Sequence, residues 1–557
     1  MPKISGIITC QTAKQPNSQT AKQPNSQTAK QPNSYSIASW CSYRTYLNDT
    51  DKSKTLISNE KNHEYLLLEN ESSDLWFFLS QNNSFANLLN YAATRNIDEE
   101  SLISFLDELS EAELLVSYDF QENSLTAEPL SAPTQDKNTP DAQLEYEISE
   151  WAYSQGFLFS AHWEITYRCN EICVHCFNPG AAHTSDEKPN RNRDELTTAE
   201  SFALIDDLVK AGVFRLTISG GEATLRKDFF EIVSYARSRG LSVVLYTNGL
   251  RLTDDFIEKL KPLWLHAVEI SIYSSNPEIH DSITNVKGSF QKSVDALSML
   301  KNSNIKAVMK SVQMQQTVHG YQLTRELGEK LNINVVIDSL LSPALDGKKA
   351  PLNYELPFAE MVALAATAGS PLFVGDMENN WDKKDVQKIL DKPVCGAGRK
   401  TLSIDPEGQI SPCVAFPVHI GNVREKGFYP SWQRSQLQKQ TSELNSDSLK
   451  NVSTNDFLSA WQSITLKSFD ECGTHERCAW CNGLCPGDAL LYSNNPLAAA
   501  ENHCRESSAR MTAAKMLMNG LNQHEIYAQL GVSTDLGRQY ESREKPTYPH
   551  FRLQLSS

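Results

Sequence analysis

The sequence predicts an α/β protein with a partial (β/α)6 TIM-like barrel, a winged-helix-like domain before it and a cysteine-rich domain after it. Three observations predict this arrangement. Between 144 and 345, β-prone segments alternate with helical patterns, whereas residues 35–121 show strands followed by three helices. Ten of the twelve cysteines lie in three groups, at 169–176, 395–413 and 472–504. In a reducing compartment, such grouping is typical of metal or cluster ligands rather than disulfides.

The N-terminal segment 1–34 is expected to be disordered. Residues 11–34 are three copies of QTAKQPNS, with no aromatic and almost no aliphatic side chain. Such a segment cannot bury enough apolar surface to offset its ordering entropy. A period of eight residues is also too short for the unit of a helical solenoid.

Residues 35–121 are predicted to form a small winged-helix-like domain. Two β-prone stretches at 55–58 and 65–70 precede helical patterns near 72–81, 85–95 and 99–112. The last pattern places its apolar residues at helical spacing, and these residues are Leu102, Phe105, Leu106 and Leu109. The domain carries no basic stripe, which argues against DNA binding. Residues 122–143, rich in Pro, Ser, Thr and Asn, are expected to be a linker.

The central domain, 144–345, is predicted to be the barrel. Repeated β-α units imply a parallel sheet, and helical patterns such as 197–212 and 289–303 fill most of the gaps between strands. In such folds the active site gathers at the carboxyl ends of the strands. The predicted strands are 163–168, 214–219, 242–247, 267–273, 307–313 and 334–340.

Composition limits the classes of partner that we expect this protein to bind. A formal net charge of -16 argues against nucleic acid, since phosphate binding usually needs a basic face. No apolar run approaches the roughly 20 residues that span a bilayer, and the start lacks the pattern of a secretory signal. We therefore expect a cytoplasmic protein with no membrane and no nucleic-acid partner.

The first cysteine group follows the first barrel strand in the segment EITYRCNEICVHCFNPG. The thiolates of Cys169, Cys173 and Cys176 are spaced to hold three irons of a cubane cluster and to leave the fourth iron open. Structural zinc is the alternative, but it needs four closed ligands. His175 would have to be the fourth, and its position next to Cys176 would strain the loop.

The Cys-x3-Cys-x2-Cys run followed by Phe177 resembles the defining motif of the radical S-adenosylmethionine (SAM) superfamily. Further matches follow at successive strand ends: Gly220, Gly221 and Glu222 in ISGGEATLR, then Thr247, Asn248 and Gly249, then Ser271. The resemblance implies a SAM-binding [4Fe-4S] cluster held by Cys169, Cys173 and Cys176 as the catalytic centre. It also implies that Phe177, Gly220, Gly221, Glu222, Asn248 and Ser271 contact SAM, which is cleaved to a 5′-deoxyadenosyl radical.

The C-terminal cysteines in 395–510 resemble a SPASM domain, which carries one or two auxiliary [4Fe-4S] clusters. By that resemblance Cys395, Cys413 and Cys485 hold one cluster, and Cys472, Cys481 and Cys504 hold the other. The sequence departs from the family pattern, because His475 stands at one cysteine position and Cys478 is an additional thiol. Either residue completes the second cluster, and thiolate is the commoner ligand.

The first auxiliary cluster lacks a ligand in the sequence. Residues 396–412 contain no cysteine where the family has one, so an open iron or a non-cysteine ligand is implied. A zinc ribbon over 472–485 is the alternative interpretation. Residues 346–394 are a bridging region. The tail 511–557 begins as a helical pattern, and no function is assigned to it.

The 35–121 domain resembles the RiPP-recognition-like (PqqD-like) domains of enzymes that mature ribosomally made peptides. Such domains bind a leader peptide as an added strand. Its apolar residues Leu75, Trp76 and Leu79 fit a core better than a binding surface. Together the three resemblances imply modification of a leader-bearing precursor peptide by cross-linking, epimerisation or backbone excision. They also imply an electron donor such as flavodoxin or ferredoxin.

Two other functions remain open from the sequence. One is maturation of a folded protein subunit, similar to sulfatase-maturing or quinone-cofactor-forming enzymes. The other is a non-catalytic peptide-binding or iron–sulfur scaffold protein. His280 and Asp281, after the fourth strand, either face the cavity or cap a loop, and capping is the expected role.

Overall fold

The computed structural model describes residues 34–47, 53–118, 140–178, 194–367, 390–437, 454–469 and 485–533, with a few isolated positions besides. The first two copies of the octapeptide repeat and almost all of the third lie outside these residues, as do most of the 122–143 linker and Cys472, His475, Cys478 and Cys481. None of the helices among the described residues is long and apolar enough to span a bilayer.

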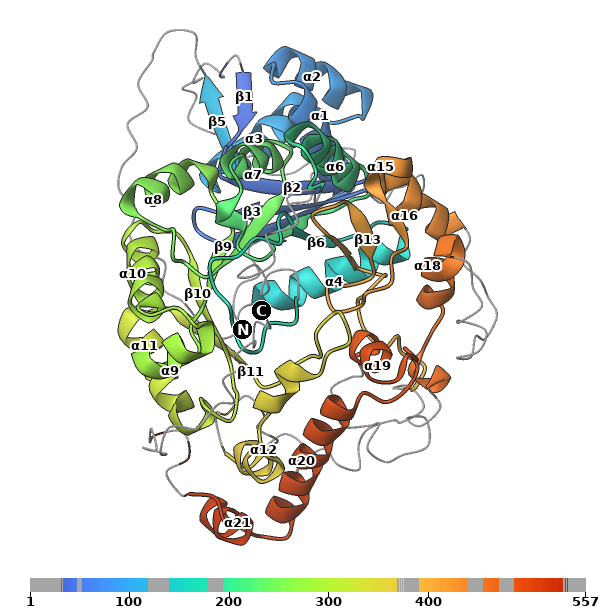
Figure 1. The fold of residues 1–557 in the computed structure, drawn as a ribbon. Helices are drawn as coiled ribbons and strands as arrows, with labels where there is room; N and C mark the ends of the chain where they lie inside the picture. Colours follow the sequence, from blue (N-terminus) through green and yellow to red (C-terminus); the bar gives the residue numbers. More distant parts are fainter. Residues whose placement is uncertain are drawn as a thin grey trace, which may run out of the picture.

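The barrel sheet contains the six parallel strands expected from the sequence. Each of these strands pairs in parallel with the next one along the chain, from β6 to β11. Helices α6 (Thr198–Lys210), α7 (Phe229–Ser238), α8 (Asp254–Leu260), α10 (Ser289–Asn302) and α11 (Tyr321–Leu331) cover its outer face (Figure 1). The strands are β6 (Ser160–Glu164), β7 (Arg215–Ser219), β8 (Ser242–Thr247), β9 (Ala267–Ser271), β10 (Ala307–Val312) and β11 (Asn334–Asp338).

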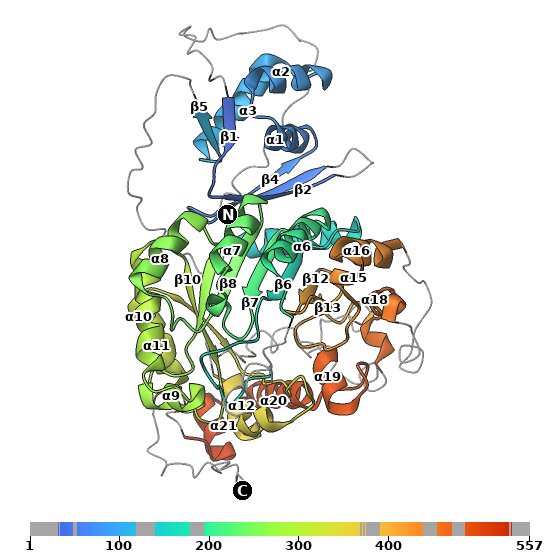
Figure 2. The same cartoon turned by 45° about the horizontal axis from the view of Figure 1, so that its top comes forward.

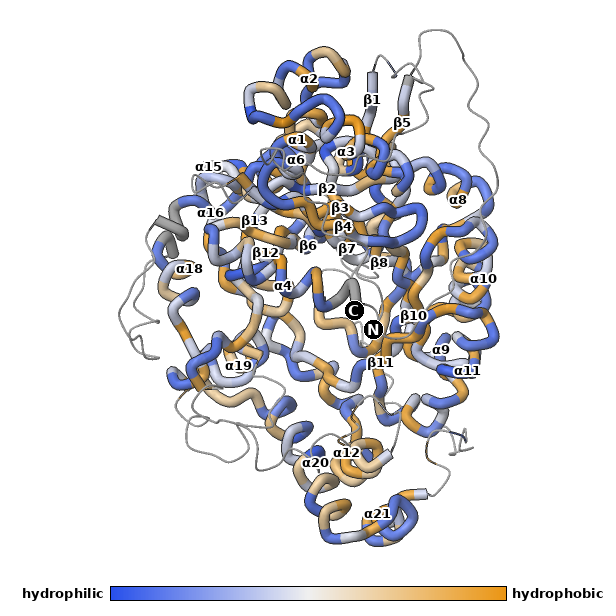
Figure 3. Tube along the Cα trace, turned by 180° about the vertical axis from the view of Figure 1, so that it is seen from behind, coloured by the Kyte–Doolittle hydropathy of each residue, from blue (hydrophilic) through white to orange (hydrophobic). Residues whose placement is uncertain are grey.

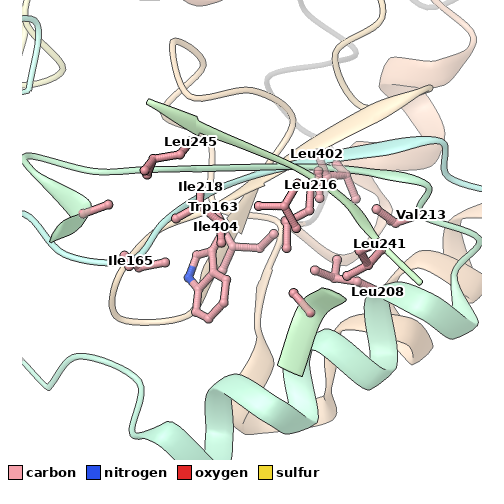
Figure 4. Close-up of a cluster of buried hydrophobic side chains, with 14 of the residues drawn as sticks. Trp163, Ile165, Leu208, Val213, Leu216, Ile218, Leu241, Leu245, Leu402 and Ile404 are labelled. Atoms are coloured by element: carbon pink, nitrogen blue, oxygen red, sulfur yellow. The ribbon is translucent and has the colours of Figure 1, made fainter. Parts of the chain in front are cut away.

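The sheet continues into the C-terminal region. Strand β12 (Thr401–Ile404) pairs in parallel with β6, and β13 (Gln409–Ser411) and β14 (Gly421–Asn422) follow in antiparallel order. Leu402 and Ile404 of β12 lie among the barrel residues Trp163 and Leu216 in one apolar core (Figure 4). The cysteine-rich region is therefore built onto the edge of the barrel sheet, which fixes its first loops relative to β6.

Local sequence explains how the first barrel helix begins. Thr197 caps α6, because its hydroxyl oxygen accepts a hydrogen bond from the Glu200 N–H and the Glu200 carboxylate accepts one from the Thr197 N–H. Glu200 also accepts a hydrogen bond from Arg424 Nε at 2.7 Å. Because Arg424 lies in the short helix α15 (Val423–Lys426), this ion pair ties the C-terminal region to the barrel.

The N-terminal module has a three-stranded antiparallel sheet and three helices. The sheet runs in the order β2 (Cys41–Tyr46), β3 (Lys54–Asn59) and β4 (Glu64–Glu69), and a separate pair joins β1 (Ser34–Ile37) to β5 (Leu115–Tyr118). The helices are α1 (Glu71–Gln81), α2 (Phe85–Thr94) and α3 (Glu99–Glu111), close to the expected ranges. Strands β1, β2 and β5 were not expected from the sequence, and the winged-helix assignment stays a prediction.

This module packs against the end of the barrel where the strands begin (Figure 2). The helices of the module pack on one face of its sheet. The other face of the sheet packs against α4 (Pro140–Ser154) and Phe214. At the junction Arg44 Nε donates to the Val213 carbonyl at 2.8 Å, and the Tyr43 N–H donates to the Gly240 carbonyl at 2.9 Å. The module is thus bound to the barrel by both apolar and backbone contacts.

A second apolar cluster lies away from the barrel. It joins α12 (Phe358–Ala365) to α20 (Glu501–Met518) and α21 (Gln523–Leu530). Figure 3 shows hydrophobic segments along the central strands, while the surrounding helices alternate between hydrophilic and hydrophobic residues. The helical pattern expected at the start of the 511–557 tail thus belongs to α20 and α21, which pack as structural elements.

Candidate active site and cluster-binding cysteines

The three cysteines of the first group lie on one short loop at the carboxyl end of β6. The loop is held against α9 (Pro277–Thr284), because the N–H groups of Ile172 and Val174 donate to the carbonyls of Thr284 and Ile283 at 3.0 and 2.9 Å. Within the loop, the Cys176 N–H donates to the Cys173 carbonyl at 3.1 Å. The backbone, rather than a disulfide, therefore sets the positions of the three thiols.

The donor set fits an iron–sulfur cluster. Burial raises the pKa of the Cys169 thiol to about 12 and raises the pKa values of Cys173 and Cys176. A buried thiol with a raised pKa loses its proton only when a bound cation stabilises the thiolate. The thiolate is also the form that ligates metal. Three thiols supply ligands for three irons of a cubane cluster, whereas a structural zinc ion needs four closed ligands.

The two glycines of the GGE segment allow β7 to meet the cysteine loop. The N–H groups of Gly221 and Glu222 donate to the carbonyls of Thr166 and Arg168 at 2.8 and 2.7 Å. A Cβ on Gly220 would lie 2.1 Å from the Thr166 oxygen, and one on Gly221 would lie 2.4 Å from the Arg168 oxygen. Glycine is required here by backbone contact within the protein, a reason that the sequence alone did not reveal.

Glu222 joins the ends of three neighbouring segments. Its buried carboxylate accepts hydrogen bonds from the Thr224 N–H at 3.0 Å, the Thr247 hydroxyl at 2.8 Å and the Asn248 N–H at 2.8 Å. Asn248 Nδ2 in turn donates to Asn170 Oδ1 at 2.6 Å, inside the cysteine loop. The GGE and TNG segments and the cysteine loop are thus one connected polar network.

The remaining expected SAM contacts lie around the same strand ends. Ser271 is the last residue of β9, and Phe177 follows the cysteine loop, with its carbonyl accepting from the Leu345 N–H at 2.8 Å. Both side chains are half-buried. The structure therefore brings all the expected barrel residues to the carboxyl end of the sheet.

Three residues at this end were not expected as site residues. Tyr273 places its hydroxyl 4.0 Å from the Cys173 sulfur and packs edge-on against His175, with ring centroids 4.6 Å apart. Glu171 is buried beside Cys173, and burial raises the pKa of its carboxyl to about 8. Glu171 and His175 stand inside the cysteine segment itself, so their sequence position was the available signal. Nothing in the sequence marked Tyr273.

His280 and Asp281 have structural roles, as expected. Asp281 accepts from the N–H groups of Gly288 and Phe290 at 2.5 and 2.9 Å, which caps the start of α10. His280 Nδ1 accepts from the Tyr273 N–H at 3.2 Å.

Three C-terminal cysteines come together from distant parts of the chain. The Gly398 N–H, three residues after Cys395, donates to the Pro412 carbonyl at 3.0 Å, next to Cys413. Gly487 follows Cys485, and a Cβ there would lie 1.8 Å from the Ala415 oxygen. The loops of Cys395, Cys413 and Cys485 are therefore in direct contact.

The environment of these thiols resembles that of the first group. Burial is the main cause that raises the pKa values of Cys395, Cys413 and Cys485, the last to about 12. Cys504 lies in the first turns of α20 and is half-buried. The other expected ligands, Cys472, Cys478, Cys481 and His475, lie outside the described residues.

Comparison with known proteins agrees with this geometry. Residues 163–315 match the radical SAM superfamily, and residues 395–450 match the iron–sulfur cluster-binding domain named SPASM. Over 297 residues the chain is 32% identical to the mycofactocin maturase MftC of Mycolicibacterium smegmatis, covering 50% of this chain and 71% of that protein. Over 295 residues it is 28% identical to an AdoMet-dependent heme synthase of Methanosarcina barkeri, and the match covers 49% of this chain and 82% of that protein.

A solved structure shares the fold. Streptococcus suis SuiB bound to its precursor peptide SuiA is 15% identical, with a TM-score of 0.51, covering 84% of this chain and 99% of that one. The fold and the strand-end site define a radical SAM enzyme. This chain belongs to the radical SAM superfamily and carries a SPASM domain, so it binds a [4Fe-4S] cluster, SAM and auxiliary iron–sulfur clusters.

Proposed function

We propose that this chain uses radical SAM chemistry to modify a ribosomally synthesised precursor peptide by cross-linking, epimerisation or backbone excision. The observation that carries the proposal is the N-terminal module. It is packed directly on the catalytic barrel, and its sheet ends in a strand, β4, that pairs with β3 on one side and with no other strand among the described residues. An edge of this kind can take an extended peptide as an added strand.

The cysteines and polar residues of the barrel have distinct proposed roles. Cys169, Cys173 and Cys176 hold the cluster, which when bound supplies the electron that cleaves SAM to methionine and a 5′-deoxyadenosyl radical. The backbone around Gly220 and Gly221 orients the methionyl group of SAM. Glu222 fixes the backbone of this segment and of Asn248 rather than contacting solvent. The remaining contacts to SAM are proposed for Phe177, Asn248 and Ser271.

The C-terminal cysteines form two proposed ligand sets, one for each auxiliary cluster. Cys395, Cys413 and Cys485, whose loops touch, would hold one cluster. Cys472, Cys481 and Cys504 would hold the other, completed by His475 or Cys478. These clusters could accept the electron that an oxidised product releases, while an external donor such as flavodoxin or ferredoxin reduces the first cluster.

A leader bound at β4 would be far from the cysteine loop. The module contacts the starts of the strands, at Val213, Gly240 and His266, whereas the cysteine loop follows the end of β6. Five strand residues span about 17 Å at roughly 3.3 Å each, so a substrate needs a spacer of at least about five extended residues between leader and modified position. We expect precursor peptides with shorter spacers to bind without being modified.

Relatives support more than one substrate class. The names of MftC and SuiB refer to a maturase and to a complex with a precursor peptide, whereas the heme synthase points to a tetrapyrrole. The docked N-terminal module favours the peptide. A short precursor gene beside this one would favour peptide modification, whereas a large enzyme partner would favour maturation of a folded subunit.

The first test is 5′-deoxyadenosine formation by anaerobically reconstituted, reduced protein. We expect turnover in the native chain, with iron near three cubane clusters, and its loss in Cys173→Ala. Cys41→Ala is the matched control, since Cys41 is a buried thiol of the N-terminal module. Unchanged cleavage in Cys173→Ala would contradict the cluster assignment. Absence of both cluster and cleavage in the native chain would leave a scaffold role.

Co-expression with neighbouring short open reading frames tests the substrate. We expect a mass change in one peptide, present with the native chain and absent with Cys173→Ala. A mass change on a tetrapyrrole, with no peptide modified, would contradict the proposal.

A further inference from the structure

One auxiliary cluster site has three cysteines and a buried carboxylate. Cys395, Cys413 and Cys485 meet through their loops, and no cysteine stands between 396 and 412 to complete four ligands. Asp488 follows Cys485 by three residues, in the first turn of α19 (Pro486–Ser493). Its N–H points to the Cys485 sulfur at 3.5 Å.

Asp488 is positioned and buried like a ligand. Its side chain is 1% exposed, and Oδ1 is a buried oxygen without a hydrogen-bond partner. A buried carboxylate oxygen left unpaired costs free energy, and a bound metal ion would remove that cost. A carboxylate oxygen of Asp488, the Cys485 sulfur and a ring nitrogen of His503 lie within 4.8 Å of one another.

The other oxygen of Asp488 is held in place. Oδ2 accepts from Asn502 Nδ2 at 2.7 Å, and His503 Nε2 lies 3.2 Å away. Asn502 is itself fixed, since the same amide donates to the Leu341 carbonyl at 2.8 Å. Such outer partners are typical of metal-ligating carboxylates, because they orient the free oxygen toward the metal.

We propose that Asp488 is the fourth protein ligand of the auxiliary cluster held by Cys395, Cys413 and Cys485, with Asn502 and His503 as positioning residues. The inference rests on the proposed assignment of these three cysteines to one cluster. A carboxylate donates less electron density than a thiolate, and replacement of thiolate ligands by a non-sulfur donor raises the potential in Rieske centres. This cluster should therefore have a higher midpoint potential than an all-cysteine equivalent.

The test reads the auxiliary clusters without any substrate. The background is full-length protein in which alanine replaces Cys169, Cys173 and Cys176. This triple substitution removes the EPR signal of the first cluster. In that background Asp488→Cys should retain iron and sulfide and shift the midpoint potential of one EPR component downward. Asp488→Ala should lose about one iron atom per chain on mild oxidation, with a [3Fe-4S] EPR signal. Cys413→Ala should abolish the same component, which identifies the cluster.

Glu501→Ala is the matched control, because Glu501 is an exposed carboxylate at the start of α20, and it should change nothing. Unaltered potential and iron content in both Asp488 variants would overturn the proposal. Nitrogen hyperfine coupling that disappears in His503→Gln would also overturn it, because His503 would then be the ligand. One zinc ion bound at Cys485 in place of the cluster would overturn it as well. These outcomes do not depend on SAM cleavage or a peptide, so failure here is distinguishable from failure of the proposed function.

Discussion

Glu222 shows how one side chain can organise a cofactor site from within the protein. Its carboxylate is 1% exposed and receives hydrogen bonds from two backbone N–H groups and two hydroxyls. Four donors converge on two oxygens, which is a pattern that only a carboxylate satisfies, since an amide would turn a donor toward them. The positions of Thr247 and Asn248 thus depend on the charge and shape of this one residue.

Glu222→Gln should therefore damage SAM binding while leaving the cysteines intact. The amide nitrogen would face donors, and each buried donor left unpaired costs about 1–3 kcal/mol. We expect a loss of roughly ten-fold or more in 5′-deoxyadenosine formation, with iron content near that of the native chain. Glu231→Gln, which changes an exposed carboxylate on α7, is the control and should be silent. Equal activity of both variants would refute the bridging role.

Single residues elsewhere agree with the expectations from sequence. Leu75, Trp76 and Leu79 are buried in the module core rather than presented on its surface. Asp281 caps α10, as argued from its residue type. These positions could be predicted because local chemistry and amphipathic spacing determine them.

At the scale of elements, the end of β7 and the loop before Cys169 are in close backbone contact. The approach requires hydrogen at two successive α-carbons, as the oxygens of Thr166 and Arg168 occupy the places of both Cβ atoms. The glycines therefore set the distance between the strand end and the cysteine loop. The geometry of the cluster site is consequently determined by the fit of two elements.

Gly221→Ala should separate these elements. A methyl group 2.4 Å from a carbonyl oxygen forces the cysteine loop to move, so we expect reduced iron incorporation and weaker SAM binding, measured by iron analysis and calorimetry. Gly421→Ala is the matched control, because its nearest neighbour would be the Ser431 hydroxyl at 3.5 Å. Full cluster loading in Gly221→Ala would show that the loop adapts to the added group.

At the scale of the whole molecule, the N-terminal module and the barrel share a buried polar network. Glu60 is fully buried, and its carboxylate accepts from Ser42 at 2.5 Å and Ser242 at 2.6 Å and pairs with His266 at 2.8 Å. Burial alone would raise the pKa of Glu60. Its contact with His266 and the positive charges of Arg237 and Arg215 instead hold that pKa well below its usual range. The junction thus depends on ionisable groups as well as on apolar contact.

This junction should weaken in acid. Burial lowers the pKa values of His63 and His266 to about 4, with Arg215 and Lys306 adding to the effect and Glu60 opposing it. An unfolded histidine titrates near 6.5, so between about pH 6.5 and 4 the unfolded state binds more protons and stability falls as pH falls. The slope is about 1 kcal/mol per pH unit for each histidine.

Hydrogen exchange of β2 and β3 amides at pH 7 and pH 5 measures this loss, after correction for the intrinsic exchange rate. We expect lower protection at pH 5 in the native chain and a smaller difference in His266→Gln. His524→Gln, at an exposed histidine on α21, should behave as the native chain does. Equal protection at both pH values would contradict the role of the histidines.

The sequence by itself determined the order of the parallel strands, the cysteine loop after β6, the GGE and TNG segments at strand ends and the helices of the N-terminal module. These features depend on residue types at short spacing, where local periodicity and ligand chemistry are sufficient. They include every barrel residue proposed to contact the cluster or SAM.

Only the tertiary structure decided how distant segments meet. It pairs β12 with β6, places the N-terminal module at the amino end of the strands and brings Asp488 beside Cys485, whose loop contacts that of Cys413. No local pattern marks a carboxylate as a cluster ligand, because Asp488 is an ordinary first-turn helix residue in the sequence. Its role depends on burial and on partners far away in the chain, and these exist only once the chain has folded.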